Sequence, residues 1–456
     1  MLKAYLVPHP PLLVEGIGNS DALESRSALG EIASEIERDN PDTLIIISPH
    51  SIMYDDYIHI APGKSASGDF ANFGAGHIKF NVDYDDELVA EVAKIAEFEE
   101  FPAGTLGEKK PALDHGVMVP LAFLGTKRKI VRVSLSGLSV IDHYFLGMII
   151  TKAAAELNRK IAVIASGDMS HKLKADGPYG LVPEGSEFDE FMQKCVKNTD
   201  FIKLCSVSNE LREKAAECGY MSLVILAGAL DGMNVKSRLL CYEAPFGVGY
   251  LTAAFEADGE TESLLPLLAE ARLKEIETRR ENESIYVRLA RANVESFVTD
   301  GKQFPLELFK GQNSLSEEML TKRAGVFVSL KIDGNLRGCI GTISPVTENI
   351  AQEILRNSVS AAAEDPRFPP VRAHELDSIT YSVDVLGAPE AIESADELDV
   401  VKYGVIVTCG HKRGLLLPNL DGVDTIEKQV SIALQKAGIN KNEPYSLERF
   451  EVIRHI

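Results

Sequence analysis

The sequence predicts an α/β protein of two domains: an N-terminal mixed or mostly parallel sheet with helices on both faces, and a smaller C-terminal α+β domain. Three observations support this prediction. The chain has 456 residues, which is too long for one ordinary domain. In its first half, apolar runs alternate with helical patterns, as in α/β proteins. A charged stretch, 256–284, then separates this half from a second one patterned as hairpins and helices.

Strands of the first half are marked by apolar runs rich in Ile and Val, a composition typical of strands that are buried on both faces. Helical spacing of apolar residues marks the segments between them. The expected strands are 43–48, 129–136 and 160–166, and the expected helices include 85–98 and 142–157. Because strands and helices alternate, we expect the helices to cover both faces of one sheet.

The charged stretch 256–284 is dense in Glu, Arg and Leu, and its apolar residues have helical spacing. We therefore expect a domain at 1–258, a linking helix at 259–283 and a second domain at 284–456, with each domain folding as a separate unit. In the second domain the patterns predict helices and hairpins in mixed order. The expected helices are 286–298 and 347–364, and the expected hairpins are 325–343, with an Asp333-Gly334 turn, and 403–418.

Composition and charge exclude several classes of protein. The formal net charge is −21, which disfavours binding to nucleic acids and to anionic membrane surfaces. No run is long enough to span a bilayer and the N-terminus lacks the apolar core of a signal peptide, so we expect a cytoplasmic protein. The cysteines form no CxxC pair, which argues against a zinc ribbon and for reduced thiols. They are Cys195, Cys205, Cys218, Cys241, Cys339 and Cys409. The oligomeric state stays open, a homo-oligomer included.

Three histidines directly follow predicted strands. His9 lies in "VPHPP", His50 follows "TLIIISP" and His171 follows "KIAVIASGDMS". Sites in open α/β sheets form beyond the carboxyl ends of the strands, so these side chains are expected to converge. His115 follows an aspartate, Asp114, that would fix the orientation of its ring. One such histidine alone is more often a hydrogen-bonded structural residue, but four in similar positions favour a shared site.

Two histidines do not complete a metal site, and the usual third ligand for ferrous iron is a carboxylate. The segment "RLLCYEAPFGVGYLTAAF" offers Glu243 among apolar neighbours, where an unpaired charge is costly. A metal would supply the missing partner. The alternative is a glutamate that faces solvent at a strand end, and the segment alone does not decide between the two.

Five short motifs occur in a specific order: "VPHPPLL", "SPH", "DHGVMVPL", "SGDMSH" and "YEAPFGVGY". In this order they resemble the class III extradiol ring-cleavage dioxygenases and the related Memo family. The resemblance covers the first half of the chain. It implies that His9, His50 and Glu243 hold non-haem ferrous iron. It further implies that His171 is an acid/base residue beside dioxygen and substrate, and that His115 is another active-site histidine.

The resemblance implies an iron(II)-dependent dioxygenase that opens a small, catechol-like aromatic substrate, with Zn, Mn or Cu as alternative metals. Neutral His171 would take a catechol proton and return it later. Asp168 would either orient that ring or cap its turn. Memo-type relatives carry a cysteine near the position of the glutamate, and Cys241 keeps open whether it replaces Glu243 as a ligand.

In the second half, "NLRGCIGTI" and "AAAEDPRFPPV" resemble the AMMECR family over residues 284–456. A fusion of this domain with the first resembles proteins of the AmmeMemoRadiSam system. That resemblance implies a functional association with a radical SAM enzyme, without implying a reaction. The alternative to an oxygenase is therefore a metal-binding partner protein with no ring cleavage of its own.

The "LRGCIG" segment supplies a second candidate site. Arg337 and Cys339 occupy alternate positions of a predicted strand, so both are expected on one face. An arginine beside a thiol would lower the pKa of the thiol and make it nucleophilic. Gly338 and Gly341 would allow a ligand to approach the backbone closely. The alternative is a buried cysteine next to a surface arginine.

Overall fold

The computed structural model describes residues 2–18, 22–109, 112–332, 334–420 and 422–456. The chain divides into two compact units, Met1–Leu273 and Lys274–Ile456, called unit 1 and unit 2 below. The division falls within helix α9, Leu265–Asn282, in the charged stretch for which a helix is predicted. The expected domain limits at 258 and 284 stay predictions.

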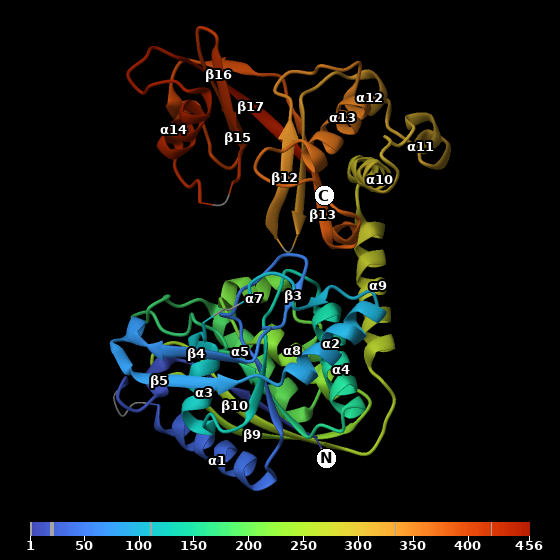
Figure 1. Ribbon diagram of the computed structural model, residues 1–456. Coiled ribbons are helices and arrows are strands. Elements are labelled where there is room, and N and C mark those ends of the chain that lie inside the picture. The colour runs from blue at the N-terminus through green and yellow to red at the C-terminus, as the bar shows by residue number, and fades with distance from the viewer. Residues whose placement is uncertain (1, 19–21, 110–111, 333, 421) are drawn as a thin grey trace. The chain divides into compact units, whose positions relative to one another are not determined.

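In the described part of unit 1, six strands form a mixed sheet in the order β7-β2-β8-β1-β10-β9 (Figure 1). The four strands from β7 to β1 are parallel, whereas β10 and β9 are antiparallel to their neighbours. The prediction of a mixed or mostly parallel sheet is therefore confirmed. The strands are β1 Leu2–Val7, β2 Thr43–Ile47, β7 Lys129–Val133, β8 Ile161–Ser166, β9 Asn234–Glu243 and β10 Tyr250–Asp258.

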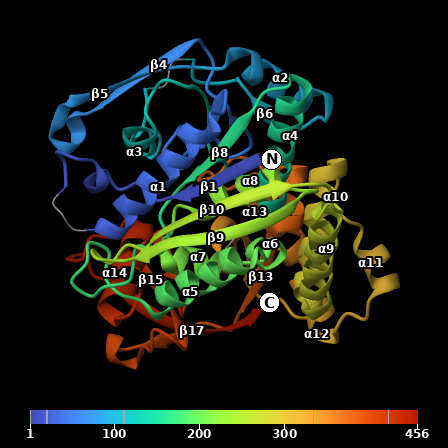
Figure 2. The same cartoon turned by 90° about the horizontal axis from the view of Figure 1, so that it is seen from below.

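The sheet is buried on both faces because each central strand is apolar at nearly every position. In β1, Ala4 and Leu6 pack into the core on one face, and Tyr5 and Val7 pack into the core on the other. The first face is covered by α2, α4, α5 and α8, and the second by α1, α3 and the hairpin β4-β5. Figure 2 shows β9 and β10 running between α1 and α5.

The remaining elements of unit 1 complete these two layers. The helices are α1 Leu23–Asp39, α2 Asp86–Phe98, α3 His115–Leu124, α4 Val140–Glu156, α5 Pro183–Asn198, α6 Phe201–Leu204, α7 Asn209–Ala215 and α8 Tyr220–Ala229, with 3-10 turns at Pro11–Leu13 and Ala71–Phe73. The short strands are β3 Ile58–His59, β4 Ser65–Phe70, β5 Ala75–Asp83 and β6 Ala103–Gly104. The segments predicted as helices at 85–98 and 142–157 correspond to α2 and α4.

Unit 2 has a curled antiparallel sheet whose described strands follow the order β12-β11-β13-β17-β15-β16, with β14 paired to β17. Helices α10 and α13 cover one face of its first half, and α14 packs on β15 and β16. Both predicted hairpins are present, as β11-β12 and β15-β16. Of the predicted turn, Asp333 lies outside the described residues. Among the described helices of both units, none is at once long enough and apolar enough to cross a bilayer.

The strands of unit 2 are β11 Val326–Ile332, β12 Asn335–Gly341, β13 Ile379–Leu386, β14 Glu390–Ile392, β15 Tyr403–Cys409, β16 Lys412–Leu416 and β17 Ser446–His455. Its helices are α10 Ile285–Asp300, α11 Leu306–Gln312, α12 Glu317–Thr321, α13 Ile350–Ala363 and α14 Ile426–Ala437, with 3-10 turns at Ala373–Ser378 and Ala395–Glu397.

Candidate metal centre

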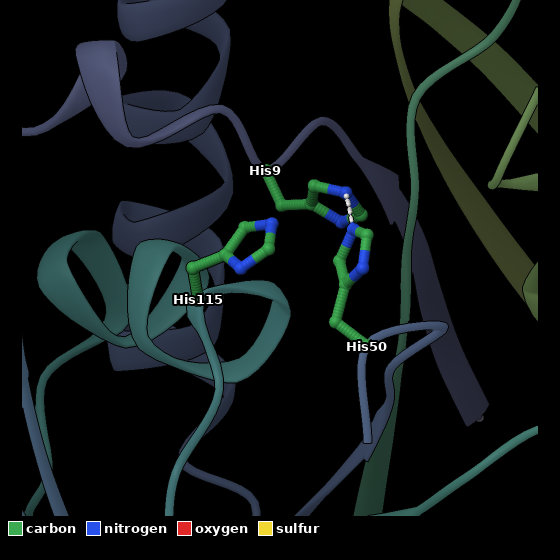
Figure 3. A group of neighbouring side chains, drawn as sticks. All are labelled: His9, His50 and His115. Carbon is green, nitrogen blue, oxygen red and sulfur yellow. Dashed lines mark hydrogen bonds between the residues drawn. The ribbon is translucent and has the colours of Figure 1, made fainter. Parts of the chain in front are cut away.

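The carboxyl ends of three parallel strands place two histidines face to face. Strands β1, β8 and β2 lie side by side, with Val7 paired to Ser166 and Ile47 paired to Ala165. The chain bends just beyond β1 and β2, and the Nε2 atoms of His9 and His50 lie 3.0 Å apart. The predicted convergence of these two side chains is therefore observed. Their facing nitrogens are the centre of the site (Figure 3).

The third ring of the cluster belongs to His115, the first residue of α3. It stacks on His50 with centroids 4.0 Å apart and meets the edge of His9 at 5.3 Å. The three residues each offer a nitrogen atom, and these atoms lie within 4.8 Å of one another. Figure 3 shows that the rings come from three separate segments and point toward one another. We call this group the histidine cluster.

The tautomer of His9 follows from its hydrogen bonds. Its Nδ1 atom lies 3.0 Å from the hydroxyl oxygen of Ser166. That hydroxyl donates its proton to the carbonyl oxygen of Gly116 at 2.6 Å, so it accepts from His9. The proton of a neutral His9 ring is therefore on Nδ1, and the lone pair of Nε2 is directed toward His50. A ligand histidine needs this arrangement, with one nitrogen fixed by a partner and the other free to bind.

Burial keeps the cluster uncharged. It lowers the pKa of His9 well below the ordinary value, and neighbouring histidines, His50 first, lower it further. Partial desolvation of its ring likewise lowers the pKa of His50, although this residue is exposed overall, and burial lowers that of His115 to about 4. Near neutral pH the three rings are therefore neutral. Neutral imidazole is the form that binds metal ions, because a protonated ring has no free lone pair.

A second group of ligand atoms shares His9 and adds Asp168 and Cys218. The sulfur of Cys218 lies 3.4 Å from Nε2 of His9. A carboxylate oxygen of Asp168 accepts the backbone N–H of His9 at 3.0 Å, and burial raises the pKa of this carboxyl to about 7. Asp168 thus fixes the bend that carries His9. Its carboxylate is bonded to backbone, as the predicted turn-capping role requires, and not to the ring of His171.

Two glycines allow the segment of Cys218 to reach the strand ends. The carbonyl oxygen of Asp168 accepts the backbone N–H groups of Cys218 and Gly219 at 3.2 and 2.9 Å. At Gly167 a Cβ atom would lie 2.1 Å from the Cα atom of Gly219, closer than atoms can approach. The two chain segments therefore touch backbone to backbone, and this contact puts Cys218 beside His9.

His171 lies at the border of the site. Its Nε2 atom is 3.7 Å from the sulfur of Cys218, and its ring stacks on the exposed Tyr179 with centroids 5.3 Å apart. Burial lowers the pKa of His171, so its ring can accept a proton. It belongs to neither group of ligand atoms. Its acid/base role stays a prediction, to which this position is suited.

Asp114 does not orient His115 as predicted. Its carboxylate accepts the hydroxyl protons of Ser48 and Ser51 at 2.6 and 2.7 Å, and also the N–H of Val117 at 3.2 Å. The expectation came from adjacency in the sequence, but Asp114 is the N-cap of α3. It therefore ties the start of α3 to the loop that carries His50.

Glu243 contacts the N-terminus of α1 and not the histidine cluster. Its carboxylate accepts the backbone N–H of Ser25 at 2.7 Å, in the first turn of α1. The N-cap residue of α1, Ala22, has no side-chain cap, so Glu243 supplies the missing acceptor and a favourable charge at the helix N-terminus. Among the described residues it joins neither group of ligand atoms. Cys241 also faces α1, 3.9 Å from Glu24, and burial raises the pKa of its thiol to about 11.

The sequence reasoning missed Cys218 and Ser166. Cys218 does not follow a strand but precedes the apolar helix α8, so a search for residues that directly follow strands does not find it. The "ECGY" segment before an apolar helical run is the one local signal that it gives. Ser166 is the last residue of β8 and gives no signal of its own, because its role depends on the position of Gly116.

In unit 2, Arg337 and Cys339 do not form the predicted pair. Arg337 forms an ion pair with Glu375 at 2.6 Å, and the register of β11 with β12 shifts beside it. Cys339 accepts the hydroxyl proton of Ser329 at 3.2 Å. Burial raises the pKa of this thiol, which supports the alternative of a buried cysteine and not an arginine-activated one. At Gly338 the close approach is made by the carbonyl oxygen of Ala361, not by a ligand.

The fold and the histidine cluster define the class: a two-domain α/β protein with a candidate metal centre. Residues 3–253 match the family model of the catalytic LigB subunit of aromatic ring-opening dioxygenase, and residues 287–455 match the AMMECR1 model. The chain belongs to the LigB family and carries an AMMECR1 domain in its C-terminal part, as the motifs indicated. The donor set at His9 agrees with the metal dependence typical of this family.

Similar proteins match either the whole chain or a part of it. A protein of Clostridium acetobutylicum is 41% identical over 99% of this chain and 98% of its own length. A protein of Thermotoga maritima is 48% identical over 37% of this chain and 96% of its own length. The crystal structure of an uncharacterized protein from Pyrococcus horikoshii is 29% identical, covers 38% of this chain and 91% of its own, and has a TM-score of 0.34. At this score the structural similarity adds nothing to the fold assignment.

Proposed function

We propose that unit 1 is a non-haem iron(II)-dependent dioxygenase of the extradiol type, which opens the ring of a catechol-like substrate. One observation carries the proposal: the Nε2 atoms of His9 and His50 face each other at 3.0 Å, and the tautomer of His9 is fixed by Ser166. His9 and His50 would hold the metal, with His115 and Cys218 as the nearest further donors. Zn, Mn and Cu are the alternative metals.

A bound ferrous ion would supply a Lewis acid that brings a catechol and dioxygen together. The chain itself would supply proton transfer and substrate binding. The neutral ring of His171 would accept a hydroxyl proton of the substrate and return it later. Exposed aromatic rings flank the site: Phe73 lies 5.6 Å from His115, and Tyr179 lies 5.3 Å from His171. Such rings are suited to packing against a planar aromatic substrate.

The test is metal analysis of protein purified without oxygen, followed by an absorbance assay of ring opening with a panel of catechols in air. The proposal expects one metal ion per chain and turnover of at least one catechol. His50→Ala should lose both, whereas the control His77→Ala changes a histidine on β5, outside the cluster, and should lose neither. Iron-loaded protein that opens no catechol would contradict the oxygenase proposal.

A second function is favoured by the position of Cys218. A thiol 3.4 Å from the ligand atom of His9 suits soft or borderline metals such as Cu and Zn better than oxygen activation at iron. As the alternative we propose a metal-binding partner protein that acts with a radical SAM enzyme and does not cleave rings. It expects Zn or Cu after anaerobic purification, metal loss in Cys218→Ser, and no ring opening with any metal. Ring opening by the iron-loaded chain would contradict it.

A further inference from the structure

Unit 2 contains a cavity of about 1120 Å³, which no part of the proposed function uses. Its floor is the face of β11, β12 and β13 turned away from α10 and α13. On β11, Val326 and Val328 point into the core, so the alternate residues Phe327 and Ser329 point into the cavity. The volume suffices for a metabolite-sized ligand, since small-molecule sites typically enclose about 300–1,000 Å³.

Polar groups form a row across this floor. Ser329 on the central strand is paired with Cys339 on one side and with Ser382 on the other, so the thiol and both hydroxyls lie on one face. Within the row, the Ser329 hydroxyl donates to the Cys339 sulfur at 3.2 Å. Thr380, Lys331 and Asp384 alternate with them on the same face, so this part of the floor is suited to contacting a polar ligand.

Another part of the lining is mostly apolar. It is formed by β16 and the segment after it, with Leu415, Leu417 and Leu420 lining the cavity. Together with Phe327 and Leu336 on the floor, these side chains offer a surface on which a hydrocarbon or aromatic body would lose its contact with water.

The charge of the cavity is opposite to that of the chain. Among the described lining residues, six basic side chains face two acidic ones, although the whole chain carries −21. The basic residues are Arg279, Lys331, Arg367, Arg413, Lys436 and Arg454, and the acidic ones are Glu283 and Asp384. Three of the arginines are already paired, with Asp365, Glu448 and Asp384.

Lys436 on α14 is different from these arginines. Among the described residues, no carboxylate lies within ion-pair distance of its ammonium group, and partial desolvation lowers the pKa of this amine. The neighbouring Cys339 thiol raises this pKa, and the positive charge of Arg367 lowers it. The Lys436 side chain is exposed to solvent and lines the cavity without a counter-ion, so its charge is available to an anion that enters the cavity.

We propose that this cavity binds a small organic anion with an apolar body, whose carboxylate or phosphate group is held by Lys436. The leucine wall contacts the body, and the Ser329–Cys339 row contacts the polar end. The proposal is independent of the metal centre, because every lining residue belongs to unit 2.

Calorimetric titration of the full chain tests the proposal, with phenyl phosphate and phenylacetate as anionic probes and benzyl alcohol as the neutral one. At least one anion should bind, and the neutral probe should bind more than tenfold more weakly. Lys436→Met should weaken anion binding by about tenfold or more, the effect expected from a charge-assisted hydrogen bond. The control Lys428→Met removes an exposed lysine of the same helix and should change nothing. The tighter of the two anions identifies the head group.

The position of the bound anion is tested separately, by the rate at which iodoacetamide alkylates Cys339, followed by mass spectrometry. The anion should slow this reaction and benzyl alcohol should not. The unmodified chain suffices for this measurement if Lys436→Met fails to fold. His50→Ala should retain the binding, which separates this site from the metal centre. Absence of anion binding, equal binding by Lys436→Met, or no protection of Cys339 would each overturn the proposal.

Discussion

The sulfur of Cys218 lies 3.4 Å from the Nε2 atom of His9, the nitrogen whose lone pair is directed into the site. Burial raises the pKa of this thiol well above its ordinary value, and the carboxyl of Asp168 adds to the shift. A bound cation would act in the opposite direction, because coordination deprotonates a thiol outright. Whether Cys218 binds the metal ion together with His9 therefore decides between a centre with a sulfur ligand and one with only nitrogen and oxygen ligands.

The first prediction concerns that sulfur. Cys218→Ser should lower the affinity for Zn²⁺ by about tenfold or more, because a hydroxyl is a poor substitute for a thiolate ligand. Cobalt(II) added in place of zinc should give a thiolate charge-transfer band that the variant lacks. Cys241→Ser is the matched control, since this buried cysteine faces α1. Equal zinc affinity of both variants, without a thiolate band in the unmodified chain, would remove Cys218 from the ligand set.

The second prediction concerns the hydrogen bond that sets the tautomer of His9. Ser166→Ala removes the acceptor of the Nδ1 proton and should weaken metal binding by about 10- to 100-fold. Ser222→Ala is the control, because this equally buried hydroxyl has no partner among the described residues. The measurement is metal release to a competing chelator. Unchanged release from Ser166→Ala would show that the ring does not need this partner.

The third prediction separates proton transfer from metal binding. His171→Ala should keep its metal, because His171 is outside both groups of ligand atoms. It should lower turnover of a catechol by roughly 100- to 10,000-fold, the usual contribution of a general acid/base. Metal content and initial rates are measured on the same preparation. Loss of the metal would make His171 a ligand, and an unchanged rate would end its proposed role.

The fourth prediction decides the role of Glu243. Glu243→Ala removes the acceptor at the N-terminus of α1 and should lower the free energy of unfolding by about 0.5–2 kcal/mol. Metal occupancy under chelator challenge should stay unchanged, in contrast to His50→Ala. Urea unfolding and metal analysis of both variants make the comparison. A stable Glu243→Ala protein that has lost its metal would restore the ligand set of two histidines and a glutamate.

The fifth prediction follows from His143, which is wholly buried in α4. Its Nδ1 atom contacts the carbonyl oxygen of Ser139 at 2.9 Å, and its Nε2 atom accepts the N–H of Ser136 at 3.3 Å. Protonation of Nε2 would break the second contact. Burial lowers the pKa of His143 to about 4 in the folded chain, whereas the unfolded chain titrates near 6.5. The stability contributed by the neutral ring is therefore present above about pH 6.5.

This contribution is lost as the pH falls from about 6.5 to about 4, because the unfolded chain then binds a proton that the folded chain does not. The total is about 3 kcal/mol at 1.36 kcal/mol per pKa unit. His143→Gln should show a shallower decline of the free energy of unfolding between pH 7 and pH 5 in urea titrations. Parallel declines in both proteins would assign the acid sensitivity to other groups.

Features that depend on a short stretch of sequence could be predicted, whereas features that depend on the path of the whole chain could not. The strands β2 and β8 are continuous Ile- and Val-rich runs, so their burial was evident, and His9 and His50 followed because parallel strands end at one edge. The pairing of β9 and β10 as antiparallel strands depends on the path of the whole chain, and no local pattern states it.

The partner of Glu243 could not be predicted either, because it is distant in the sequence. The premise that a charge in an apolar segment needs a partner was sound. The partner in the structure is the N-terminus of α1, 218 positions earlier in the sequence, and nothing near Glu243 indicates this contact. Cys218 escaped notice for the converse reason, since it reaches the site from the start of a helix rather than from the end of a strand.

The contact between Gly167 and Gly219 has a consequence for how such a centre is altered. Neither residue carries a functional group, yet together they decide whether the sulfur of Cys218 stands beside His9. A methyl group at either position would push the two segments apart and withdraw the thiol while every ligand residue stayed in the sequence. Substitutions at two residues without functional groups would therefore change which atoms of this protein can bind a metal ion.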